Sequence, residues 1–367
     1  MSFYVKKGRI LTNLVSFIFE GHIMFRKIYI NNFRGIDNLE IEQLGRVSVL
    51  TGKNNVGKST ILEALFLLFG YKNPFTFQQI NLIRGNEALY DNESLFEPLF
   101  YHFDTTNEIK ISVDGDDSNE SLQISKDSKY VFANIKEEDS ISYQTDYKEN
   151  YSLKYKYIYN DFYEEGNYGV NKAGLLRNSN AHGDNNLTSL REVRCCYINS
   201  HIAKMEKQLI DWIGKLEVRN KKDVLIKAIN SIIPEVRDAF VTVINGRGRL
   251  YLKTLTDIVP YSMVGDGTEK LLYIVLSMMA NPGIIILLDE AENGIHYSIM
   301  EKMWDVIYRV AEDTKSQIIA TTHSLECIKY LHAAMNDKNA ADISVHRIEK
   351  EENFKAFRFG TEDIELI

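Results

Sequence analysis

The loop from Gly52 to Thr60, with the sequence Gly-Lys-Asn-Asn-Val-Gly-Lys-Ser-Thr, constrains this chain more than any other feature. An apolar strand at 47–50 precedes it and an apolar helix at 61–69 follows it, which is the context of a phosphate-binding loop. There the glycines let backbone N–H groups surround phosphates, Lys58 reaches the terminal phosphates, and the Ser59 hydroxyl is a ligand for Mg²⁺. The chain is therefore predicted to be an α/β protein that binds a nucleotide. The nucleotide-binding residues expected in the loop are Gly52, Asn54, Asn55, Gly57, Lys58, Ser59 and Thr60.

The composition favours a globular, cytoplasmic protein. With 44% apolar and 11% aromatic residues over 367 positions, the chain can bury the core of one large or two smaller domains. A formal net charge of −8 gives no general attraction for nucleic acid, so contact with DNA or RNA would need a local basic patch. The three cysteines form neither a disulfide framework nor a metal-binding pair, which favours a reducing compartment. No apolar run reaches the roughly 18 residues of a membrane-spanning helix, so we expect no membrane partner.

The first part of the chain divides into a short extension and a β-rich lobe. Residues 1–23 are interpreted as an N-terminal extension, because Met24 directly precedes the first convincing strand; translation starting at Met24 is a hypothesis that a mass measurement would test. Residues 24–127 are predicted to form the first lobe, with strands on both sides of an Asn-Asn-Phe-Arg-Gly turn, the phosphate-binding loop, and a hairpin within 103–127.

An inserted region is predicted over residues 128–235. It is rich in Tyr, Asn, Lys and Asp; the tyrosines at 151–159 have the period of a strand, and Gly174 to Asn186 is expected to be an exposed loop. A helical pattern covers 201–233, with apolar positions on one stripe and basic positions on another. Acidic residues alternate with the basic ones, so a solvated, salt-bridged face is favoured over a nucleic-acid contact. The basic stripe consists of Lys204, Lys215, Arg219 and Lys222.

The second lobe, 236–367, contains two further elements that suit phosphate chemistry. Gly265-Asp266-Gly267 begins an apolar helix, whose N-terminus offers free N–H groups and a positive dipole to a phosphate that arrives from outside the first loop. The buried strand 284–288 then ends in Asp289-Glu290, at the edge where α/β proteins bind ligands. Asp289 can hold Mg²⁺ through water, and Glu290 can polarise the water that attacks the γ-phosphate.

A last strand at 317–321 ends in Thr322-His323-Ser324, at the same predicted sheet edge. His323 could donate a hydrogen bond to the γ-phosphate or to the attacking water. The structural alternative is that His323 only caps the helix that begins at Ser324.

The order of these four elements resembles that of the ABC-type ATPases, in the SMC-like and RecF-like branch. Within that branch, Asn31 to Gly35 is similar to the opening Asn-Phe-Arg/Lys turn. The segment from Asp289 to Ser298 is similar to the Walker B motif and D-loop of bacterial AAA-annotated ATPases. Those ATPases are related to the ATPase domain of overcoming-lysogenization-defect nucleases, and their relatives often belong to phage-defence systems.

The resemblance implies a mixed central sheet, a β-rich N-terminal lobe, an inserted β/helical region, and a homodimer that encloses two ATP molecules. It assigns Lys58 to the phosphates, Ser59 and Asp289 to Mg²⁺, Glu290 to the role of water-activating base, and His323 to the role of γ-phosphate switch. Arg34 is an additional expected phosphate contact.

The chain departs from the family pattern in two respects. Gly265 stands where the signature usually has serine, and Asp266 replaces the next glycine, so phosphate contact from Gly265 and Gly267 would rest on the backbone and the helix dipole. An acid beside a phosphate would need a neighbour such as Lys270. The magnesium-ligating glutamine has no clear equivalent; the candidates are Gln78, Gln79 and Gln123.

The preferred function is a Mg²⁺-dependent ATPase that dimerises on ATP and controls a partner effector encoded nearby, such as a toxin or nuclease in phage defence. The 44 residues after His323 are too few for a nuclease domain of its own. The alternative is a RecF-like DNA-binding ATPase of DNA repair or chromosome maintenance that uses the basic stripe. A transport ATPase is disfavoured by the atypical signature and the long insertion.

Overall fold

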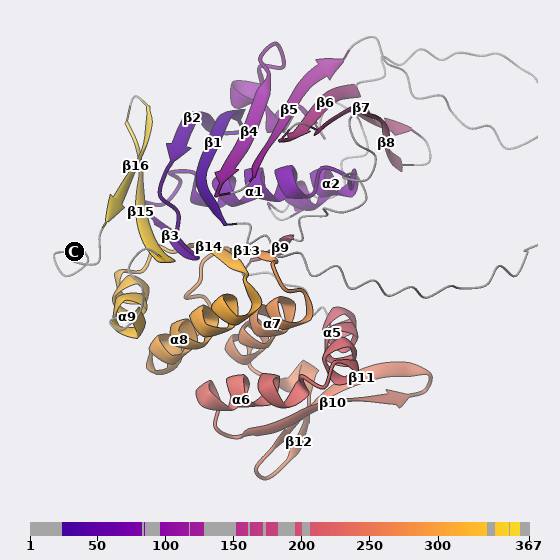
Figure 1. Ribbon diagram of the computed structural model, residues 1–367, viewed down its shortest axis with the longest axis vertical. Helices are drawn as coiled ribbons and strands as arrows, with labels where there is room; N and C mark the ends of the chain where they lie inside the picture. Colours follow the sequence, from indigo (N-terminus) through magenta and orange to yellow (C-terminus); the bar gives the residue numbers. More distant parts are fainter. Residues whose placement is uncertain are drawn as a thin grey trace, which may run out of the picture.

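The computed structural model describes residues 24–82, 84, 96–116, 118–127, 152–160, 162–171, 174–182, 195–199, 206–335, 342–351 and 353–359. The predicted extension, 1–23, lies outside this range. Figure 1 shows two layered lobes, with the N-terminal strands in indigo and magenta at the top and the orange helices below.

The upper lobe is a seven-stranded sheet with the order β2-β1-β4-β5-β6-β7-β8 (Figure 1). Each neighbouring pair is antiparallel. The predicted hairpin is confirmed, with Asp114 opposite Asn119 at its turn. The strands are β1 (Phe25–Phe33), β2 (Ile36–Ile41), β4 (Ile109–Gly115), β5 (Asn119–Asp127), β6 (Ser152–Tyr159), β7 (Phe162–Asn171) and β8 (Gly174–His182).

The expectation of a loop at Gly174 to Asn186 is wrong over its described part, because β8 pairs with β7 along its length. Asn, Ser and Gly disfavour strands by propensity, but the backbone of β7 supplies the ladder that makes this edge strand. The strand predicted from the tyrosine period is confirmed as β6. Since β6 to β8 extend the same sheet as β1, residue 128 does not mark a sheet boundary.

Aromatic side chains of β6 and β7 contact the end of the helix that follows the phosphate-binding loop. Tyr71, just beyond that helix, stacks on Tyr157 with 3.9 Å between ring centroids and donates a hydrogen bond to Glu164 at 3.2 Å. Tyr168 donates to the Tyr71 carbonyl at 2.6 Å. Tyr157 and Tyr168 of the predicted insertion therefore take part in this buried contact.

The central sheet has six strands in the order β16-β15-β3-β14-β13-β9. All neighbouring pairs are parallel except β15 and β16. Its strands are β3 (Val47–Thr51), β9 (Cys195–Ile198), β13 (Ile285–Leu288), β14 (Gln317–Thr321), β15 (Ile343–Lys350) and β16 (Phe354–Phe359).

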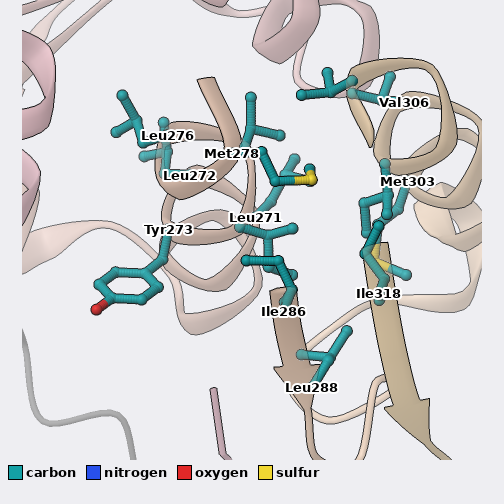
Figure 2. Packing of buried hydrophobic residues seen from close by; sticks show 14 of the residues in the cluster. Leu271, Leu272, Tyr273, Leu276, Met278, Ile286, Leu288, Met303, Val306 and Ile318 are labelled. Carbon is teal, nitrogen blue, oxygen red and sulfur yellow. The ribbon is translucent and has the colours of Figure 1, made fainter. Parts of the chain in front are cut away.

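Helices cover both faces of the central sheet, which explains its continuously apolar strands. On one face, Ile285 and Leu287 of β13 join a core shared by α1 and the seven-stranded sheet. On the other face, Ile286 and Leu288 pack with α7 and α8, as Figure 2 shows. The helices are α1 (Lys58–Phe69), α2 (Phe75–Leu82), α5 (Glu206–Val218), α6 (Lys222–Ile232), α7 (Asp266–Ala280), α8 (Tyr297–Thr314) and α9 (Leu325–Met335).

A three-stranded antiparallel sheet leads into α7. It consists of β10 (Val236–Ile244), β11 (Arg247–Thr254) and β12 (Ile258–Pro260), followed by the 3-10 turn η3 (Tyr261–Met263). Two further 3-10 turns, η1 (Glu97–Leu99) and η2 (Tyr101–Phe103), precede β4. None of the helices in the described ranges is long and apolar enough to cross a membrane.

Candidate nucleotide-binding and hydrolysis site

The phosphate-binding loop joins β3 to α1 as predicted. Gly52 and Gly57 have φ of +139° and +91°, a region that favours glycine, and a Cβ at Gly52 would lie 2.4 Å from the Ile348 carbonyl oxygen. The Lys58 ammonium donates hydrogen bonds to the carbonyls of Gly52 at 2.7 Å and Lys53 at 2.9 Å. Partial burial lowers the pKa of Lys58, while nearby carboxylates, Asp289 first, oppose that shift. The loop thus holds a cation above its own backbone, where a phosphate oxygen would be bound.

The structure brings Ser59 and Asp289 together across 230 residues of sequence. The Ser59 hydroxyl donates to Asp289 Oδ1 at 3.0 Å, and the Thr321 hydroxyl donates to the same oxygen at 2.6 Å. Oxygen donors of this kind are what Mg²⁺ prefers, usually with one or two carboxylates and phosphate oxygens around it. Ser59 and Asp289 are therefore the residues that could hold Mg²⁺.

Tyr197 is a contact to Asp289 that sequence reasoning missed. Its hydroxyl donates to Asp289 Oδ2 at 3.3 Å, and its ring lies 5.5 Å from the Phe66 ring. Burial, with Asp289 nearby, raises the pKa of Tyr197, so the phenol stays protonated as a donor. The only sequence signal is the short apolar run Cys195–Ile198, which was predicted to lie in the insertion but forms β9 beside β13.

Glu290 follows Asp289 at the end of β13 with a left-handed φ of +49°, a conformation that is uncommon for a non-glycine residue. Its N–H donates to Thr321 Oγ1 at 2.8 Å, and its carboxylate accepts from the Asn293 amide. Strained backbone of this kind often marks functional positions. Glu290 is half-buried.

Gly265 and Gly267 lie at the start of α7, as predicted, and Gly265 is the N-cap. Gly265 and Asp266 are exposed, whereas a Cβ at Gly267 would lie 2.3 Å from the Gly294 carbonyl oxygen. Gly267 therefore lets α7 approach the segment after β13 closely.

The structure gives Lys270 a different partner from the Asp266 carboxylate expected from the sequence. Its ammonium is buried and donates to the carbonyls of Glu290 at 2.6 Å, Asn293 at 3.2 Å and Ala291 at 3.3 Å. Burial lowers the pKa of Lys270 to about 8, against the opposing effect of nearby carboxylates. Lys270 thus ties the signature helix to the segment after β13.

His323 follows β14, and its imidazole is half-exposed, with Nδ1 3.0 Å from Glu292 Oε1. The alternative that His323 caps the next helix is wrong, because Ser324 Oγ accepts the Cys327 N–H at 3.2 Å at the start of α9. The side-chain contact of the imidazole is therefore to Glu292 and not to the start of α9.

Arg34 lies in a buried ion network next to α1. Its guanidinium lies 3.1 Å from Glu63, one turn after Ser59, and donates to Asn81 at 3.0 Å. Arg84 pairs with the same Glu63 at 2.8 Å and donates to Thr60 Oγ1 at 2.9 Å. Arg34 thus braces α1 in this structure, and its phosphate contact stays a prediction.

The remaining candidates from the sequence are the three glutamines considered for Mg²⁺ and the two asparagines of the phosphate-binding loop. Gln78 and Gln79 are on α2 and Gln123 is on β5, whereas hydroxyl groups supply the contacts to Asp289. Asn54 and Asn55 lie exposed on the phosphate-binding loop.

The described members of the basic stripe all have partners. Lys215 pairs with Asp211 at 2.7 Å, Lys222 pairs with Glu217 at 3.0 Å, and Arg219 donates to the Ala280 carbonyl. Lys204 lies outside the described residues. The favoured interpretation of a salt-bridged face therefore agrees with these contacts.

Comparison with known proteins identifies the family. The family described as "AAA domain, putative AbiEii toxin, Type IV TA system" matches residues 47–328. The chain belongs to this family. It is 29% identical over 343 residues to an ATP/GTP phosphatase of Helicobacter pylori, covering 87% of this chain and 90% of that protein. It is also 46% identical over 62 residues to the DNA replication and repair protein RecF of Clostridium acetobutylicum, over 17% of each chain.

The fold is that of an SMC head. A crystal structure of the SmcHead bound to the C-winged helix domain of ScpA aligns with a TM-score of 0.52 and 12% identity, covering 92% of this chain and 99% of that one. With the family match, this likeness confirms the predicted α/β fold and the resemblance to ABC-type ATPases of the SMC and RecF branch.

Proposed function

We propose that this ATPase hydrolyses ATP with Mg²⁺, dimerises when ATP binds, and uses the dimer to control a partner effector in antiviral defence. The observation that carries the proposal is the meeting of the phosphate-binding loop, the Asp289–Glu290 pair and His323 at one edge of the central parallel sheet. Ligands of α/β proteins bind at the C-terminal ends of such strands.

Each group then has a role that suits its position. Lys58 neutralises charge on the terminal phosphates, while Ser59 and Asp289 hold Mg²⁺. Glu290 polarises the attacking water, and His323 contacts the γ-phosphate. Mg²⁺ would supply charge neutralisation at the phosphates. The relative named ATP/GTP phosphatase supports hydrolysis as the reaction.

Dimerisation is supported by the exposed start of α7. Its first N–H groups lack partners within the helix, and its dipole is positive at this end, so the terminus suits a phosphate from outside. Gly265 and Asp266 are exposed there. A second copy that brings this terminus to the phosphate-binding loop would complete each site.

The mass of the protein in solution tests this step. We expect Glu290→Gln, which slows hydrolysis, to run at about twice the 42.3 kDa of the chain with ATP and Mg²⁺ in light scattering, and Glu290→Gln with Gly265→Leu to stay monomeric. Gly265 has φ of −66° and open space around its Cβ position, so leucine fits the monomer. Gly214→Leu on α5, where the Cβ position is also open, is the matched control. If Glu290→Gln with Gly265→Leu still formed dimers with ATP, the proposed homodimer that encloses two ATP molecules would be refuted.

The effector and the defence role rest on the family description, which names a toxin and a toxin–antitoxin system. The SMC head in the matched structure holds a domain of ScpA, a precedent for partner binding on this fold. The test is phage plating on cells that carry this gene with its neighbouring open reading frame. Loss of protection in Glu290→Gln supports the proposal, and unchanged protection contradicts it. All three cysteines are free, in keeping with the cytoplasmic location that we also propose.

A RecF-like DNA-binding ATPase is the second candidate, favoured by the 46% identity to RecF over 62 residues. It would use the stripe of Lys215, Arg219 and Lys222. Phosphate contacts would make DNA affinity fall steeply with salt, and charge reversal of the three residues would abolish it. Affinity that is insensitive to both changes would exclude this candidate.

A further inference from the structure

Both oxygens of the Glu292 carboxylate bind the residues that follow β14. Oε1 accepts the His323 N–H at 3.1 Å and lies 3.0 Å from His323 Nδ1. Oε2 accepts the Thr322 hydroxyl at 2.8 Å. The Glu292 side chain is only 11% exposed, whereas the His323 side chain is 49% exposed. One carboxylate therefore holds both the backbone and the ring of His323.

The segment that carries Glu292 is itself fixed from several sides. Lys270 binds the carbonyls of Glu290, Ala291 and Asn293, and the Ala291 N–H donates to Thr321 O at 2.9 Å. Gly267 packs against the Gly294 carbonyl. Because its backbone is held in this way, the Glu292 carboxylate has a fixed position, and the hydrogen bond from His323 Nδ1 to it sets the orientation of the imidazole.

A carboxylate oxygen held next to Nδ1 determines which ring nitrogen of His323 is left to contact the nucleotide. Nδ1 must carry a proton to bind a carboxylate, so the neutral ring has its lone pair on Nε2. When the ring is protonated, Nε2–H becomes a donor while the Nδ1–H contact stays unchanged. Nε2 is thus the ring nitrogen presented to phosphate or water at the sheet edge.

We infer that Glu292 is a positioning residue that fixes the tautomer and orientation of His323, so that Nε2 faces the nucleotide. The inference rests on the proposed function, in which His323 contacts the γ-phosphate. The carboxylate acts through the imidazole, as carboxylates orient histidines in other polar sites. A purely structural tie between the two loops would require only the contacts to Thr322 and to the His323 backbone.

The first test reads the tautomer without nucleotide. Long-range ¹H–¹⁵N correlation of protein labelled with ¹⁵N-histidine, recorded at pH 9, reports which ring nitrogen carries the proton. His323→Asn assigns the signal. We expect the Nδ1–H form in the wild type and in Glu292→Gln, whose amide oxygen can still accept, and a mixture of tautomers in Glu292→Ala. The Nε2–H form in the wild type, or no change in Glu292→Ala, would overturn the inference.

The second test measures ATP hydrolysis. We expect Glu292→Ala to lower kcat by about 10- to 100-fold, the range for losing such an orienting partner, with the KM for ATP nearly unchanged and with partial rescue in Glu292→Gln. In a His323→Ala background, Glu292→Ala should have no further effect, because the group that it orients is gone. Equal effects in both backgrounds would instead indicate a structural tie.

The controls separate folding and function. Glu326→Ala removes an exposed glutamate from α9 near His323 and should leave kcat unchanged. Circular dichroism checks that Glu292→Ala is folded. If the wild type proved to hydrolyse no ATP, the proposed function would fail, yet the tautomer measurement would still decide the contact between Glu292 and His323.

Discussion

At the scale of single residues, Tyr197 has the clearest separable role, because its hydroxyl binds Asp289 while its ring packs on Phe66. Tyr197→Phe keeps the packing and removes one donor from the carboxylate that is proposed to hold Mg²⁺. We expect the Mg²⁺ concentration for half-maximal ATP hydrolysis to rise by about tenfold, with kcat at saturating Mg²⁺ little changed. A magnesium titration of the hydrolysis rate is the measurement. Tyr251→Phe on β11 is the control, and equal titration curves for both variants would contradict the role of Tyr197.

His346 on β15 predicts an acid-sensitive stability. It is 1% exposed, and its Nε2 has no hydrogen-bond partner in the described part of the chain. Burial, with Arg358 opposite it, lowers the pKa of His346 to about 4. The unfolded chain, with an imidazole pKa of about 6.5, then binds the proton more readily. Stability from the neutral ring is complete above pH 6.5 and is lost as the pH falls toward 4.

Between pH 8 and pH 5 this group alone should lower the free energy of unfolding by about 2 kcal/mol. Urea unfolding of the wild type and of His346→Leu at both pH values isolates it, since the other titrating groups are common to the two proteins. The difference in stability between them should shift by that amount in favour of the variant at pH 5. A difference that is independent of pH would contradict the prediction.

At the scale of elements, Gln317 joins the start of β14 to the upper lobe. Its side chain is buried; it accepts from the Phe25 N–H at 3.0 Å and donates to the carbonyls of Phe25 at 2.8 Å and Gly45 at 2.9 Å. Gln317→Leu would leave three buried backbone groups without this partner, and each such group costs about 1–3 kcal/mol. We expect a loss of at least about 3 kcal/mol in urea unfolding. Gln79→Leu, on the exposed side of α2, should change stability little. An equally small effect of Gln317→Leu would contradict a stabilising role for the Gln317 hydrogen bonds to Phe25 and Gly45.

At the scale of the whole molecule, α1 links the phosphate-binding loop to both sheets. It packs in a core with the seven-stranded sheet and with one face of the central sheet. ATP with Mg²⁺ at about 100 times Kd should therefore raise the free energy of unfolding by about 2.7 kcal/mol and stabilise both lobes together. Trp212 and Trp304 report the lower core by fluorescence, and hydrogen exchange in β4 and β5 reports the upper sheet. Lys58→Ala should abolish both shifts, and a shift confined to one lobe would contradict the coupling.

The sequence predicted those features whose signal is local. The phosphate-binding loop, the apolar strand before Asp289 and the hairpin at Asp114 to Asn119 each have a pattern contained within a few neighbouring residues. The strand that became β8 was missed, because its polar residues are held by pairing with β7 and not by their own propensity. The strand β9 was missed for the same reason, because its four residues form a strand through pairing with β13.

The sequence by itself determined the order of the motifs, and with it the chemistry available: a lysine and a serine at one helix start, two acids after a buried strand, and a histidine after the next. Only the tertiary structure decided which polar groups meet. In the folded chain Lys270 binds three backbone carbonyls, Arg34 pairs with Glu63, and Glu292 binds His323. Long polar side chains reach several positions at similar cost, so their partners depend on where the chain brings distant charges and carbonyls into a shielded space.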